Sequence, residues 1–69
     1  CEVTAPLPGL LVELRIAEGQ PVKAGAVVAV LESMKMHMEL RAPRDGVVQS
    51  IHATPGQEVQ QGTVLAIIG

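Results

Sequence analysis

The chain contains 69 residues, of which 48% are hydrophobic and none is aromatic, and its net charge at pH 7 is −2. This length allows one small domain and excludes an enzyme with a deep substrate cleft of its own. The chain has five basic and seven acidic side chains and no aromatic ring that could stack on a base, so we expect no nucleic-acid partner. The core depends on aliphatic residues and Met, and the branched aliphatic residues favour strands.

The only cysteine is Cys1, so an intramolecular disulfide and a multi-cysteine zinc site are excluded. We therefore expect a reducing compartment, the cytoplasm, or the mitochondrial matrix in a eukaryote. The longest hydrophobic runs, such as residues 26–31, reach about a third of the length of a membrane span, and no membrane partner is expected. Because the chain begins at Cys1 instead of Met and ends on an apolar run, we expect one domain over residues 1–69, excised from the C-terminal part of a larger chain.

The sequence contains an internal repeat. At an offset of 37 residues, residues 2–32 align without gaps with residues 39–69, and ten of the 31 pairs are identical. The identical pairs include residues that shape turns, namely Pro6 with Pro43, Gly9 with Gly46, Gly19 with Gly56, and Gly25 with Gly62. Residues 33–38 form a connector that has no counterpart in either half.

Each half is predicted to contain a strand, a turn, a short strand, a second turn and a final strand. In the first half these elements fall at residues 12–16, 18–20, around Val22, 24–25 and 26–31. Their equivalents in the second half are residues 47–51, 55–57, around Val59, 61–62 and 63–68. The first strand alternates apolar and polar residues, which is typical of a half-buried strand, whereas the last is a continuous apolar run.

A β unit of about thirty residues is too small to bury its own apolar face. We therefore expect an all-β fold, a flattened β-barrel or sandwich of two quasi-symmetric four-stranded halves packed face to face about a pseudo-two-fold axis. The same symmetry brings the chain ends together and places residues 33–38 as a six-residue hairpin tip away from them. A loop on a rigid scaffold is the expected position for a functional site.

The connector contains one of the two lysines, Lys35, between Met34 and Met36. The other, Lys23, aligns with Gln60 in the repeat and is predicted to be a solvated turn residue. Exposed thioethers suit a surface that meets several partners, and a lysine that is acylated there becomes a long neutral arm. The period-two pattern further predicts Met38 and Leu40 on the inner strand face, with His37, Glu39 and Arg41 outward.

The motif Glu32-Ser33-Met34-Lys35-Met36 resembles the attachment motif of the biotinyl domain of biotin-dependent carboxylases. The resemblance implies a flattened barrel of the biotinyl/lipoyl-carrier type, the barrel-sandwich hybrid. It also implies biotin bound covalently to Lys35, with Met34 and Met36 flanking it for recognition. The resemblance covers the whole chain, including positions Ala5, Pro6, Gly9, Gly19, Val22, Gly25, Ala42, Pro43, Gly46, Gly56, Val59 and Gly62.

This resemblance implies a carrier with no catalysis of its own. A biotin protein ligase would attach the biotin, a biotin carboxylase using ATP and bicarbonate would carboxylate it, and a carboxyltransferase would pass the carboxyl group to an acceptor, with an acyl-CoA expected ahead of pyruvate or urea. Two residues depart from the family pattern: Ser33 replaces the commonest Ala, and His37 stands where Glu often follows. Residues 17–21 leave no room for the thumb-like insertion of some bacterial carrier subunits.

Two alternatives remain at the level of sequence. A lipoyl carrier domain has the same barrel but typically Asp-Lys-Ala at its tip, and Met on both sides of Lys35 argues against it. The second alternative is a β module for protein interaction or metal binding, in which the Met and His side chains around Lys35 hold Cu(I) through soft ligands.

Overall fold

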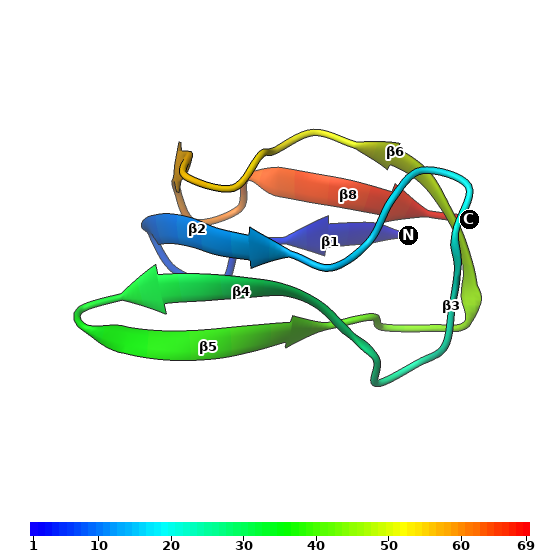
Figure 1. Ribbon diagram of the computed structural model, residues 1–69, viewed down its shortest axis with the longest axis horizontal. Coiled ribbons are helices and arrows are strands. Elements are labelled where there is room, and N and C mark those ends of the chain that lie inside the picture. Colours follow the sequence, from blue (N-terminus) through cyan, green and yellow to red (C-terminus); the bar gives the residue numbers. More distant parts are fainter.

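The computed structural model describes all 69 residues and consists of β-strands joined by turns (Figure 1). The eight strands in chain order are β1 (Glu2–Thr4), β2 (Gly9–Leu14), β3 (Pro21–Val22), β4 (Val27–Ser33), β5 (Met36–Arg41), β6 (Gly46–Ile51), β7 (Glu58–Val59) and β8 (Val64–Ile68). The expected all-β class is confirmed. The structure contains no helix that could span a membrane.

Two antiparallel four-stranded sheets make up the fold, with strand orders β1-β8-β6-β3 and β5-β4-β2-β7. Each strand of the first sheet is related by the 37-residue offset to the strand at the same place in the order of the second sheet. This relation confirms the quasi-symmetric four-stranded halves. The two repeats are not themselves the layers, however. Each sheet takes two strands from each repeat, because strands as short as β3 and β7 gain ladder partners only from the other repeat.

β-bulges also follow the repeat. The pairing of β2 with β4 shifts between Leu11 and Glu13, and that of β6 with β8 shifts between Val48 and Ser50, 37 residues later. The bulge leaves Val12 outside the ladder with 41% of its surface exposed. The prediction that residues 12–16 form one regularly alternating strand is therefore wrong. β2 begins at Gly9, ends at Leu14, and changes face at the bulge.

The turns predicted at residues 24–25 and 61–62 are confirmed, and both are left-handed. Gly25 and Gly62 have φ values of 88° and 85°, which only glycine adopts readily. In both turns a backbone N–H closes a tight loop: Ala26 donates to the Lys23 carbonyl oxygen and Thr63 to that of Gln60, each at 3.0 Å. Lys23 itself is exposed, as predicted for a turn residue.

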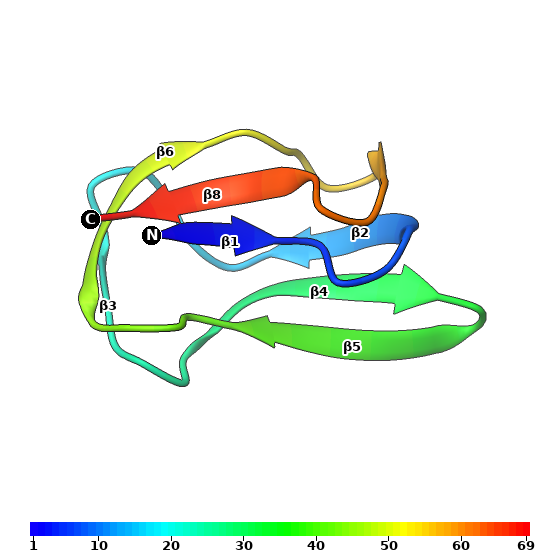
Figure 2. The same ribbon diagram turned by 180° about the vertical axis from the view of Figure 1, so that it is seen from behind.

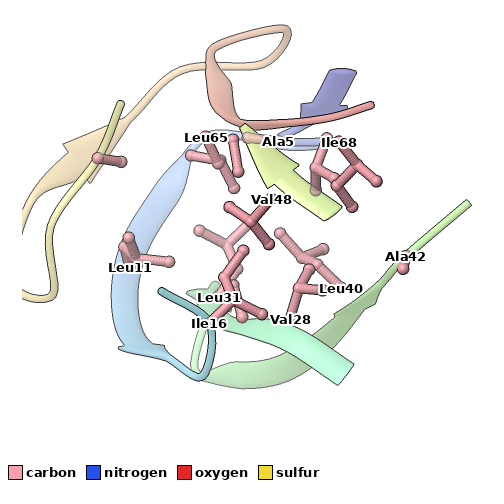
Figure 3. Close-up of a cluster of buried hydrophobic side chains, with 14 of the residues drawn as sticks. Ala5, Leu11, Ile16, Val28, Leu31, Leu40, Ala42, Val48, Leu65 and Ile68 are labelled. Atoms are coloured by element: carbon pink, nitrogen blue, oxygen red, sulfur yellow. The ribbon is translucent and has the colours of Figure 1, made fainter. Parts of the chain in front are cut away.

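Sixteen aliphatic residues form a single core between the sheets (Figure 3). No polar side chain is buried in this core, and no buried side-chain nitrogen or oxygen lacks a partner. Leu11 and Leu31 from one sheet and Leu65 and Ile68 from the other are completely enclosed. Met38 packs against the core from β5, and Leu40 is buried in it, which confirms the predicted inner face of this strand.

The chain ends are neighbours, as the repeat predicts. The N-terminal ammonium group donates to the Ile68 carbonyl oxygen at 2.8 Å, and β1 pairs with β8. Figures 1 and 2 show both ends on one side of the elongated molecule and the β4–β5 turn at the opposite side. The molecule measures 30 Å along its longest axis, so the turn is held well away from the ends.

Candidate functional site

The β4–β5 hairpin positions the residues of the sequence motif. Its ladder continues to the pairs Glu32 with His37 and Ser33 with Met36, so only Met34 and Lys35 lie outside the strands. The expected six-residue tip at residues 33–38 is therefore wrong. A longer loop would leave backbone N–H and C=O groups unpaired, whereas extended pairing satisfies them up to a two-residue turn.

The turn residues adopt an uncommon backbone conformation. Met34 and Lys35 have φ values of 54° and 66°, and they are the only residues other than glycine with positive φ. A type I′ hairpin turn requires positive φ at both central positions, and its twist matches that of the flanking strands. Asn-Gly is the usual sequence there, so Met-Lys stores strain that the surrounding ladder must hold. Strain of this kind is concentrated at functional sites.

The turn presents an amine between two thioethers. Met34 is 91% exposed and Met36 is 69% exposed, and Lys35 between them is also exposed. None of the three ion pairs in the structure involves Lys35. The ammonium group is thus accessible from solvent, as a group that is modified by an enzyme must be. The structure places all three residues of the predicted site together at one tip.

The base of the hairpin is braced by the loop before β2. The Ser33 hydroxyl group donates to the Pro8 carbonyl oxygen at 2.8 Å. Beside this bond, a Cβ atom at Gly9 would overlap the carbonyl oxygen of Glu32, so the start of β2 lies against the end of β4. Sequence reasoning missed Pro8 and Gly9 as supports of the site, although the pairing of Gly9 with Gly46 in the repeat was a signal of a close approach.

Charged side chains flank the hairpin without enclosing it. His37 Nε2 lies 3.6 Å from the Glu32 carboxylate across the ladder, and Arg41 donates to Glu39 at 2.8 Å. His37, Glu39 and Arg41 are exposed, as predicted. Farther from the tip, the hydrogen bond from the exposed Arg15 guanidinium group to Glu13 raises the pKa of Arg15 above its usual value.

The geometry separates the candidate soft metal ligands. Met36 and Met38 lie on one face of β5 and His37 lies on the other, because side chains alternate along a strand. The structure contains no pocket and no group of three His, Cys, Asp or Glu side chains that could hold a metal ion. The hairpin presents an accessible amine at its tip.

Comparison with known proteins gives the family. The family model described as "Biotin-requiring enzyme", which covers biotinyl and lipoyl domains, matches residues 1–68. The chain belongs to this family. The family model thus covers almost the entire chain, including the β4–β5 hairpin.

Carboxylases are prominent among the relatives of this family member. Pyruvate carboxylase of Schizosaccharomyces pombe is 50% identical over 36 residues, which is 52% of this chain and 3% of the relative. The biotin-dependent acyl-coenzyme A carboxylase alpha3 subunit of Mycobacterium leprae is 56% identical over 34 residues, which is 49% of this chain and 6% of the relative. The chain therefore matches only a small part of each of these proteins.

Two solved structures extend the similarity to the whole fold. A single-chain, multi-domain long-chain acyl-CoA carboxylase superimposes with a TM-score of 0.90 and 39% identity, covering 96% of this chain and 7% of that one. The urea carboxylase of Kluyveromyces lactis superimposes with a TM-score of 0.90 and 29% identity, covering 99% of this chain and 6% of that one. In both cases the matched region is a small segment of a large carboxylase.

Proposed function

We propose that the chain is a biotin carboxyl carrier domain that holds biotin in an amide bond to Nζ of Lys35. The observation that carries the proposal is the position of Lys35 in an exposed, left-handed two-residue turn between two exposed methionines. Family membership and carboxylase relatives support the choice of biotin. An accessible primary amine fits this group, because the amide bond needs no further protein ligand.

The residues of this chain contribute position to the reaction. The β4–β5 ladder and the Ser33–Pro8 bond hold the backbone of the turn, so the Lys35 side chain leaves the barrel from a fixed position and in a fixed direction at its Cα–Cβ bond. Loss of the ammonium charge on acylation turns the side chain into the root of a neutral, flexible arm. Met34 and Met36 provide apolar contact beside the amine for a biotin protein ligase.

The domain acts as a tethered carrier within a biotin-dependent carboxylase that uses ATP and bicarbonate. When bound, biotin supplies a ureido nitrogen that accepts a carboxyl group at a biotin carboxylase and releases it at a carboxyltransferase. The chain ends lie opposite the turn, so a tether at that side leaves Lys35 free to reach both partners. Tethering raises the effective concentration of the carried group at each of them.

We assign an acyl-CoA as the carboxyl acceptor and the cytoplasm, or the mitochondrial matrix in a eukaryote, as the location. An acyl-CoA carboxylase subunit is 56% identical over the matched segment, and a second acyl-CoA carboxylase shares the fold at a TM-score of 0.90. The acceptor is selected by the carboxyltransferase, so measuring which acyl-CoA or keto acid the complete carboxylase consumes tests this assignment.

Biotinylation of two lysine variants tests the proposal. The chain is produced with a biotin protein ligase, captured on streptavidin and mapped by peptide mass spectrometry. We expect biotin on Lys35, complete loss of capture in Lys35→Arg, and full capture in the matched variant Lys23→Arg, whose target is the other exposed lysine. Streptavidin capture of Lys35→Arg would contradict the proposal. Lipoate on Lys35 with a lipoate ligase, and no biotin with the biotin ligase, would favour a lipoyl carrier.

A further inference from the structure

All three methionines of the chain lie on the hairpin, and their exposure decreases away from its tip. Met34 in the turn is almost fully exposed, Met36 is largely exposed, and Met38 is half-buried against the core. The chain has no aromatic residue, and its only other sulfur atom belongs to Cys1 near the opposite side. All the thioether groups of the chain are therefore concentrated around Lys35.

A peroxide oxidises a thioether in a single balanced step. An S–O bond forms as the O–O bond breaks, the sulfur loses two electrons to the peroxide, and water leaves when the oxidant is hydrogen peroxide. The product, methionine sulfoxide, is polar, and methionine sulfoxide reductases convert it back to methionine. Exposure controls access of the oxidant, so Met34 and Met36 react before Met38.

The fold and the tip respond differently to this change. Met34 and Met36 bury little surface, so polar sulfoxides there leave the core intact, whereas a sulfoxide at Met38 would place a polar group against it. At the tip, oxidation replaces the two apolar side chains beside Lys35 with polar ones. A partner that docks on the thioethers then loses its apolar contact.

We propose that Met34 and Met36 form a peroxide-responsive modification site, whose oxidation suppresses attachment at Lys35 without unfolding the domain. This inference rests on the proposed function of Lys35. It makes loading of the carrier with its prosthetic group dependent on the redox state of the compartment. The reductase reaction makes the block reversible.

The test uses the chain with Cys1→Ser, so that no thiol reacts. Hydrogen peroxide is added before the ligase and removed with catalase, because biotin also contains a thioether. Peptide mapping is expected to show sulfoxide at Met34 and Met36 ahead of Met38. The initial biotinylation rate is expected to fall several-fold with an unchanged thermal unfolding midpoint, and to return after treatment with methionine sulfoxide reductases.

Two variants separate the tip from the rest of the hairpin, and each is compared with its own untreated sample. The double variant Met34→Leu/Met36→Leu is expected to keep its rate after peroxide, whereas Met38→Leu stays sensitive. An unchanged rate in folded protein oxidised at both tip methionines would overturn the proposal, as would an equal loss of rate in the double variant. Absence of biotin on Lys35 before any oxidation would instead overturn the proposed function.

Discussion

Met34 and Lys35 occupy a backbone conformation that the other turns of this protein assign to glycine. The four glycines with positive φ, residues 19, 25, 56 and 62, lie in the turns that the repeat duplicates, and a Cβ atom at each would meet only open space. Those turns are relaxed. The hairpin turn instead keeps two long side chains in the left-handed region, where an L-residue costs about 1–2 kcal/mol. Holding Met34 and Lys35 in this conformation therefore lowers the free energy of unfolding of the domain.

Replacing Met34 with Asn is expected to raise the free energy of unfolding by about 0.5–1 kcal/mol. Asn tolerates the left-handed region because its short side chain forms local hydrogen bonds, and the exposed Met34 side chain loses little burial. Chemical denaturation measures the change. The control Met36→Asn lies in β5, where Asn is unfavourable, and is expected to be destabilised. Lower stability of Met34→Asn would show that the turn is not strained.

The candidate site could be proposed from the sequence, whereas the strain in its turn could not. Lys35 was singled out because the connector has no counterpart in the repeat and because its motif resembles that of a known family. Positive φ at Met34 and Lys35 could not be predicted, since neither residue type favours it. The conformation is imposed by the register of β4 on β5, a long-range property that no local propensity encodes.

At the scale of elements, the hairpin is positioned by the close approach of β2 to β4. A Cβ atom at Gly9 would overlap the Glu32 carbonyl oxygen, two residues before the turn. The repeat duplicates this approach at the opposite side, where a Cβ atom at Gly46 would come within 2.6 Å of the Gly69 carbonyl oxygen. The two glycines thus provide equivalent contacts, of which only one supports the site.

Gly9→Ala and Gly46→Ala are therefore expected to reduce the stability to a similar extent, by about 1–3 kcal/mol, because backbone atoms must shift at both positions. In folded protein, only Gly9→Ala is expected to slow biotinylation, since only there does the shift displace the hairpin. Stability is measured by thermal unfolding, and the rates are measured well below the unfolding midpoint. Equal rates in the two variants would contradict the role of this contact.

Prediction from sequence was weaker for the boundaries of the elements than for their existence. All strands expected in the two repeats are present, but the bulge at Val12 moves the face of β2, and residues 33–38 are mostly strand. A bulge depends on pairing with a distant strand, so the alternation of residues 12–16 gave no sign of it. The connector was similarly expected to be a loop because the repeat offered no template for it.

At the scale of the whole molecule, a core without aromatic rings must hold both sheets together. Leu11 and Leu31 face Leu65 and Ile68 across the barrel, and each is completely buried (Figure 3). A domain of this size is stabilised by only about 3–10 kcal/mol. Each enclosed leucine is therefore a large part of the total, and the repeat distributes these residues evenly between the sheets. The sequence predicted the pseudo-symmetry but not the exchange of strands between the repeats.

Leu11→Ala is expected to lower the free energy of unfolding by about 2–5 kcal/mol, because it leaves a cavity in the core. Its neighbour provides a matched control. Val12 is turned outward by the bulge, and Val12→Ala is expected to change the stability by less than about 0.5 kcal/mol. Urea titration of both variants measures the difference. A similar loss in the two would contradict the bulge and the placement of the core.

Exchange of the two turn residues tests most directly whether the folded barrel presents the Lys35 side chain from a fixed position. Met34→Lys combined with Lys35→Met conserves composition and charge, and both positions are exposed, so the stability is expected to change little. The two central side chains of a two-residue turn leave the backbone in different directions. The amine is thereby moved by more than the ångström-scale tolerance of a group-transfer site.

The decisive measurement compares the initial biotinylation rates of the two folded proteins with the same ligase. If the fold presents the lysine, the exchanged protein is modified at a very small fraction of the original rate while its unfolding curve remains nearly unchanged. If the exchanged protein is modified within a few-fold of the original rate, the ligase recognises a flexible peptide, and the rigid hairpin has no part in presenting Lys35.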